Sequence, residues 1–117
     1  MRARFVLALA VISLPGLADA GALASGDEIR AVVSGNTVQG SLLASGDFTE
    51  FYREDGTILA KDYSGSWVVK GNQMCFTYGE DPETCWGVEI DGAQMVWMGE
   101  GGAEGTGTVI SGNPNNY

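Results

Sequence analysis

Residues 64–97 read SGSWVVKGNQMCFTYGEDPETCWGVEIDGAQMVW, and this stretch holds both cysteines and all three tryptophans of the chain. Runs of about six residues rich in Val, Met, Thr and aromatics alternate there with the polar turn residues of Gly71-Asn72, Gly79–Thr84 and Asp91-Gly92. Such spacing is typical of hairpins and not of helices. The stretch therefore predicts four consecutive strands of one antiparallel sheet.

The turns also predict which residues face each other, because a two-residue turn fixes the register of its hairpin. With a Cys75–Cys85 cross-link in the middle hairpin, the predicted pairs are Lys70 with Gln73, Val69 with Met74, Trp67 with Phe76, Met74 with Trp86, Phe76 with Thr84, Ile90 with Ala93, Val88 with Met95 and Trp86 with Trp97. All three registers gather the same residues on one apolar face: Trp67, Val69, Met74, Phe76, Tyr78, Trp86, Val88, Ile90, Met95 and Trp97. We expect this face to be buried and the opposite face to be polar.

Both cysteines fall on the opposite, polar face. Nine residues separate Cys75 from Cys85, whereas redox and zinc motifs use two, and the chain has no histidine to complete a metal site. We therefore predict a structural disulfide that staples two neighbouring strands.

The rest of the chain predicts a closed fold. Residues 36–42 and 103–110 are candidate first and last strands, and residues 47–62 predict a hairpin around Asp55-Gly56 in which Glu50 faces Lys61. Residues 25–35 predict a short helix with Ser25 or Asp27 as its cap and Gly35 at its end. We expect about eight strands in an antiparallel up-and-down barrel covered by this helix, with an open sandwich as the alternative.

The first twenty residues have the pattern of a cleaved secretory signal peptide. Two arginines precede an apolar run that is too short to cross a bilayer, and small residues follow it, so we expect cleavage after Ala20, or else after Ala24. The mature chain would be one domain, residues 21–117, with a net charge of −10. This charge argues against nucleic acid and anionic lipid as partners, and it is compatible with a basic partner.

Several short motifs resemble those of a group of small exported bacterial proteins of uncharacterised function. The motifs span about Asp27 to Pro114 and are Gly35–Gly40, Asp55-Gly56-Thr57, Ser64–Trp67, Met74-Cys75-Phe76, Cys85-Trp86, Asp91-Gly92 and Gly112-Asn113-Pro114. The resemblance implies a periplasmic β domain, and it offers no functional residues.

No catalytic motif is present. The carboxylates of Glu80, Asp81 and Glu83 cluster, but in a polar hairpin tip where solvated acids are expected. Spaced calcium ligands are missing, and two of the three methionines that could bind a soft metal, Met74 and Met95, alternate as core residues do. The sequence thus predicts a protein that is not an enzyme and needs no cofactor or metal.

Three binding functions are compatible with these features. The first is a periplasmic binding or accessory protein for a protein or envelope complex, with a basic partner as one form of it. The second is a carrier of a small apolar ligand, whose barrel interior is lined by Trp67, Phe76, Tyr78, Trp86 and Trp97. The third is an inhibitor of a cationic lysozyme, which rests on fold, location, charge and the short stretch Trp67–Gly71.

Overall fold

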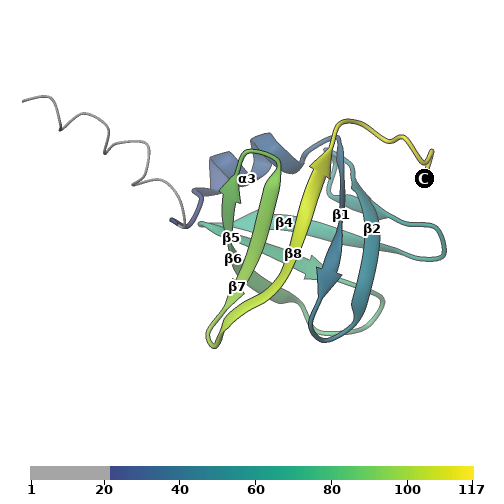
Figure 1. Ribbon diagram of the computed structural model, residues 1–117. Helices are drawn as coiled ribbons and strands as arrows, with labels where there is room; N and C mark the ends of the chain where they lie inside the picture. The colour runs from purple at the N-terminus through teal and green to yellow at the C-terminus, as the bar shows by residue number, and fades with distance from the viewer. Residues whose placement is uncertain (1–21) are drawn as a thin grey trace, which may run out of the picture.

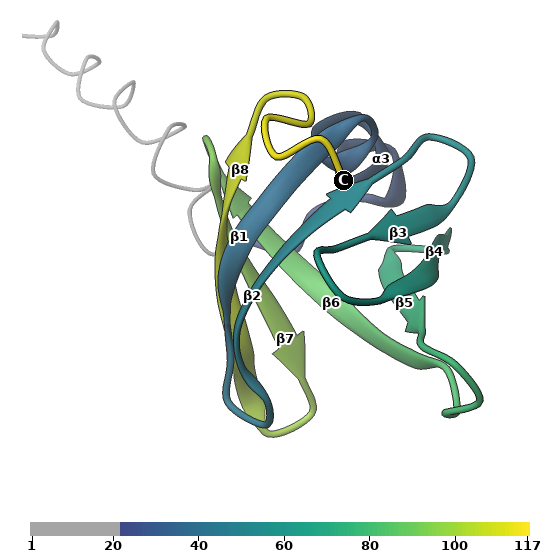
Figure 2. The same ribbon diagram turned by 90° about the vertical axis from the view of Figure 1, so that its right-hand side faces the viewer.

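A computed structural model describes residues 22–117, which form a closed antiparallel barrel with one helix (Figures 1 and 2). The predicted signal peptide lies outside the described residues. The elements are α3 (Gly26–Val33), β1 (Asn36–Leu42), β2 (Gly46–Tyr52), β3 (Thr57–Leu59), β4 (Ser64–Lys70), β5 (Gln73–Thr77), β6 (Thr84–Asp91), β7 (Gln94–Gly99) and β8 (Gly102–Ile110). Each strand pairs with the next and β8 pairs with β1, so the predicted eight-stranded up-and-down barrel is confirmed.

Helix α3 covers one end of the barrel (Figure 1). Of the two predicted caps, Ser25 and Asp27, Ser25 is the N-cap, and it forms a capping box with Glu28. The apolar side chains of Ile29 and Val33 are fully buried against the barrel. The backbone N–H of Gly26 donates to Asn72 in the β4–β5 turn, at 2.8 Å, which ties the start of the helix to the same end of the barrel.

The predicted registers of β4–β5 and β5–β6 are confirmed, including Trp67 with Phe76 and Cys75 with Cys85. The register of β6–β7 was wrong by two residues, because Gly92-Ala93 and not Asp91-Gly92 makes the turn, so that Ile90 pairs with Met95. Gly92 has a positive φ of 62° at the first turn position, as type II′ turns require. Because the error is an even number of residues, the predicted apolar face still points inward.

The predicted β2–β3 register was wrong by one residue, and the expected pairing of Glu50 with Lys61 does not form. Four residues, 53–56, connect these strands: the N–H of Gly56 donates to the carbonyl of Arg53 at 3.1 Å, and Gly56 has a φ of 97°. This is a tight turn followed by a left-handed glycine, a common longer hairpin connection. Tyr52 therefore pairs with Ile58.

The core occupies the middle of the barrel and its helix end. Its fully or almost fully buried members include Val38, Tyr52, Ile58, Met74, Val88, Met95 and Trp97. Gly107 on β8 leaves room for Trp97, since an added Cβ there would lie 3.0 Å from the indole ring and 2.7 Å from Val38.

No helix among residues 22–117 combines the length and apolar character that crossing a bilayer takes.

Both chain ends of the described region are held to the barrel. The N–H of Ala24 donates to the carbonyl of Val88 at 2.7 Å beside the Leu23–Glu89 bridge. After β8, the N–H of Gly112 donates to Asn36 and its carbonyl accepts from the hydroxyl of Thr37. These contacts fasten the C-terminal segment to the start of β1.

The Cys75–Cys85 disulfide joins the middle strands β5 and β6, as predicted. We expect replacement of both cysteines by alanine to lower the free energy of unfolding by about 3 kcal/mol, because the bridge closes a short loop in the unfolded chain. Urea denaturation measures the change. Reduction should destabilise the wild-type protein by a similar amount and leave the double variant unchanged. Equal stability of oxidised wild type and variant would contradict a stabilising role.

Candidate functional site

A cavity of about 680 Å³ opens at the end of the barrel opposite α3. The β1–β2 and β5–β6 connections and the approach to β4 surround its mouth, and Trp97 lies in its wall. Aromatic side chains dominate the lining: Phe48, Tyr52, Tyr63, Phe76, Tyr78, Trp86 and Trp97. The rings of Phe76 and Tyr78 are stacked with centroids 6.4 Å apart, and Phe76 lies 5.8 Å from Trp86.

The carboxylate of Glu50 lies in this aromatic wall and is only 4% exposed. Its Oε1 accepts a hydrogen bond from the hydroxyl of Tyr52 at 2.5 Å, and its Oε2 accepts one from Tyr63 at 2.6 Å. The hydroxyl of Tyr78 lies 3.0 Å from Oε1 and 2.9 Å from Oε2. Three phenols from β2, the β3–β4 connection and the end of β5 thus converge on one buried carboxylate, which compensates its removal from water.

Burial and the nearby carboxylate both oppose ionisation of these phenols. The pKa of Tyr78 is raised well above its ordinary value, first by burial and then by the charge of Glu50. Burial also raises the pKa of Tyr63, with the hydrogen bond to Glu50 as the second cause. The pKa of fully buried Tyr52 is raised first by burial and then by the charge of Glu50. All three phenols therefore remain protonated donors at neutral pH.

The buried N–H of the Trp97 indole has no hydrogen-bond partner among residues 22–117. Such a group costs about 1–3 kcal/mol when it leaves water unpaired. Trp97 also makes an edge contact with Phe48, with ring centroids 5.6 Å apart. The packing of this large aromatic ring, which fills the space between the core and the cavity, offsets the cost of the unpaired N–H.

Four of the five predicted ligand-lining residues line the cavity, namely Phe76, Tyr78, Trp86 and Trp97. Trp67 does not, because its indole N–H donates to the carbonyl of Arg53 at 2.9 Å, away from the cavity lining.

Glu50, Tyr52 and Tyr63 were not predicted as site residues. The signal for Glu50 was present, since Phe48, Glu50 and Tyr52 alternate along β2 and so share one face.

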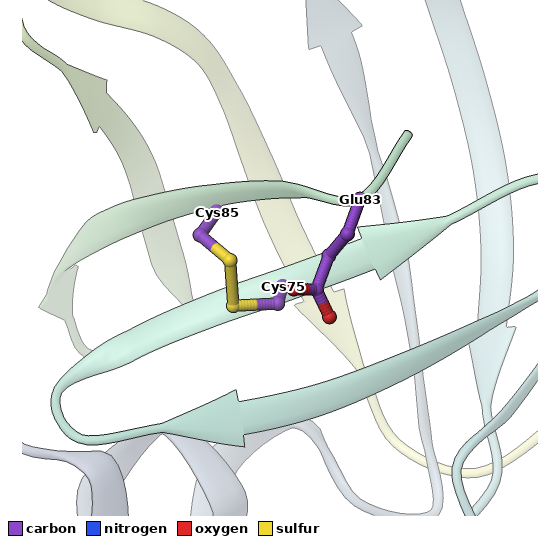
Figure 3. A group of neighbouring side chains, drawn as sticks. All are labelled: Cys75, Glu83 and Cys85. Carbon is purple, nitrogen blue, oxygen red and sulfur yellow. A yellow bond between two sulfur atoms is a disulfide. The ribbon is translucent and has the colours of Figure 1, made fainter. Parts of the chain in front are cut away.

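The other acidic cluster of the sequence lies on the β5–β6 connection at the mouth. Glu80, Asp81 and Glu83 are exposed there, and Asp81 borders the cavity. Glu83 also lies beside the disulfide (Figure 3), with its carboxylate within 4.8 Å of both sulfur atoms. The sulfurs are bonded to each other, and Glu83 forms an ion pair with Lys70 at 2.7 Å, so this group does not offer metal ligands while the disulfide is intact.

A second hollow of about 660 Å³ lies at the polar surface of β1, β2 and β8. Its walls are largely polar, and they include Gln39, Ser41, Thr49, Thr106 and Thr108. Lys61 and Tyr63 from the β3–β4 connection border it, as does the C-terminal residue Tyr117. It contains neither the aromatic cluster around Phe76 nor Glu50, but it adjoins the cavity, because Asp47, Phe48 and Tyr63 line both hollows. We call it the outer groove.

Comparisons with protein-family models, with curated proteins and with solved structures found no match to this chain. The site is therefore interpreted from its own geometry.

The tyrosine cluster predicts an unusual alkaline titration. Because the folded-state pKa values of Tyr52, Tyr63 and Tyr78 lie above the ordinary value of 10.0, their stabilising contribution is complete below about pH 10 and is lost as the pH rises through the folded-state values. Absorbance at 295 nm should show three of the four tyrosines ionising only together with unfolding, which near-ultraviolet circular dichroism reports. Ionisation of all four near pH 10 in the folded protein would contradict the buried cluster.

Proposed function

We propose that the protein binds a small, largely apolar ligand in the open end of its barrel. The observation that carries this proposal is the cavity of about 680 Å³ with a mainly aromatic lining and one polar cluster, Glu50 and its tyrosines. Ligand pockets are usually about 300–1,000 Å³ and combine apolar walls with a few placed polar groups.

The fold can hold such a cavity open because most of its core lies elsewhere. Met74, Val88 and Met95 are at most 1% exposed and do not line the cavity, and α3 adds Ile29 and Val33 to the same core. Trp86 is in contrast only half-buried and lies in the cavity wall. Most of the core therefore lies outside the cavity lining, while Tyr52, Phe76 and Trp97 belong to both.

The residues of the cavity favour ligand binding without catalysis. The chain has no histidine, which is the commonest general base, and the oxygens of Glu50 already accept hydrogen bonds from three phenols. We therefore propose a carrier or sensor and not an enzyme.

We infer that the protein acts after export, in a bacterial periplasm or outside the cell. The disulfide supports this, since such bonds persist in oxidising compartments, and residues 1–20 have the pattern of a signal peptide. Cleavage after Ala20 would keep the Leu23–Glu89 bridge and the Ala24 hydrogen bond to β6, whereas cleavage after Ala24 would remove both. Because it keeps these contacts, cleavage after Ala20 is the alternative that we favour.

The cavity can be tested with the uncharged fluorescent probe N-phenyl-1-naphthylamine. We expect its emission to rise on binding to wild type, and we expect Thr84→Trp to weaken binding about tenfold or more, because the indole would occupy the mouth that Thr84 lines. Thr106→Trp is the matched control, since Thr106 lies in the outer groove. Its affinity should remain within about twofold of wild type.

Absence of probe binding, or weakening only by Thr106→Trp, would contradict the proposal. A protein partner is the alternative that the net charge suggests. Retention of a cationic lysozyme on the immobilised protein, equal for wild type and Thr84→Trp, together with no probe binding, would favour that alternative.

A further inference from the structure

We propose that the ligand carries a cationic nitrogen, an ammonium group on an apolar body, and that this group binds against the Glu50 and tyrosine cluster. This inference rests on the proposed function, because it assigns a chemical class to the ligand of the same cavity. It follows from the hydrogen-bonding capacity of the polar wall, from the charges that line the cavity and from the rings around them.

The first step concerns hydrogen-bond donors and acceptors. A tyrosine hydroxyl has one hydrogen, and Tyr63 and Tyr78 both direct it to Glu50. Their oxygens keep lone pairs, so this part of the wall can accept hydrogen bonds from a ligand but cannot donate one. Among these phenols a carboxylate, phosphate or carbonyl would find no free donor, whereas an ammonium group would find acceptors; the hydroxyls of Ser45, Ser64 and Thr84 are donors elsewhere in the lining.

The second step concerns charge. Asp47, Glu50 and Asp81 line the cavity, and none of the four basic residues within residues 22–117 does. Three of those basic residues pair with carboxylates outside the cavity, and the fourth, Lys61, borders the outer groove. Several carboxylates in a low-dielectric cleft produce a concentrated negative potential, which favours binding of a cation.

The third step concerns the aromatic rings. Phe76, Tyr78 and Trp86 form a connected group within the cavity wall, and the half-exposed ring of Tyr63 lies 6.0 Å from Tyr78. The faces of such rings attract cations, most strongly when the pair is removed from water. The same rings can pack against the apolar body of the ligand, so one wall satisfies both parts of an organic cation.

Three probes with the same ring system test this class: 1-naphthylmethylamine, 1-naphthalenemethanol and 1-naphthoate. At neutral pH they are a cation, a neutral molecule and an anion. We expect isothermal titration calorimetry to rank their affinities in that order, with the cation binding about tenfold more tightly than the alcohol. Higher salt should weaken binding of the cation and leave binding of the alcohol unchanged.

Two variants locate the effect. Glu50→Gln should bring the affinity for the cation to within about threefold of the alcohol without changing the affinity for the alcohol. Glu54→Gln is the matched control, because Glu54 is exposed on the β2–β3 connection outside the cavity lining, and it should change neither affinity. If Glu50→Gln also abolishes binding of the alcohol, Tyr63→Phe is the deciding variant. It removes one acceptor oxygen at the accessible edge, so it should weaken binding of the cation severalfold and weaken binding of the alcohol, which can also donate to that oxygen, by less.

The outcomes separate the inference from the proposed function. Equal binding of all three probes, or preference for the anion, would overturn the cationic ligand and leave the cavity as a binding site. If Glu50→Gln also abolishes binding of the alcohol, an unchanged affinity of Tyr63→Phe for the cation would overturn the cationic ligand too. No binding of any probe would overturn the proposed function itself.

Discussion

One buried carboxylate organises the open end of this barrel. Glu50 is almost fully removed from water, a position that costs several kcal/mol for an unpaired charge, and three tyrosine hydroxyls compensate that cost. Because the tyrosines come from three separate segments, the same hydrogen bonds fix β2, the β3–β4 connection and the end of β5 around the mouth. The cluster thus sets both the shape of the cavity and its charge.

The two ends of the barrel have different roles for a simple reason. Helix α3 fills one end with Ile29 and Val33, so the apolar surface there is satisfied by the chain itself. No helix covers the other end among residues 22–117 (Figure 2). Rings such as Trp86 stay half-buried there beside the cavity. The interior of an eight-stranded barrel is just wide enough for side chains or for one small ligand, so this uncovered aromatic end is compatible with the binding that we propose.

Much of the fold could be predicted from the sequence because its turns are local and its disulfide is specific. The turn at Gly71-Asn72 and the Cys75–Cys85 pair fixed two registers, and strand alternation then placed the aromatic face inside. The β2–β3 hairpin could not be predicted in the same way, since Asp55-Gly56 fits either a two-residue turn or the longer connection that forms. That difference of one residue decides which side chains face inward.

The site was predicted only in part. Aromatic residues such as Phe76 and Trp97 followed from periodicity, but a glutamate between Phe48 and Tyr52 was given a surface lysine as its partner. Two of its three actual partners, Tyr63 and Tyr78, lie 13 and 28 positions away along the chain. A cluster of this kind depends on the closed topology, which brings β2 and the ends of β4 and β5 to the same mouth.

We propose that the open end, and not the outer groove, binds a small organic cation beside Glu50. The most direct measurement is a two-dimensional ¹H–¹⁵N NMR titration with 1-naphthylmethylamine, following the indole signals of the three tryptophans and the backbone amides. We expect the indole signals of Trp86 and Trp97 and the amide signals around Tyr78 to shift. The indole signal of Trp67, which is hydrogen-bonded to Arg53, should not shift. Shifts confined to the outer groove, around Thr106 and Gln39, would contradict it.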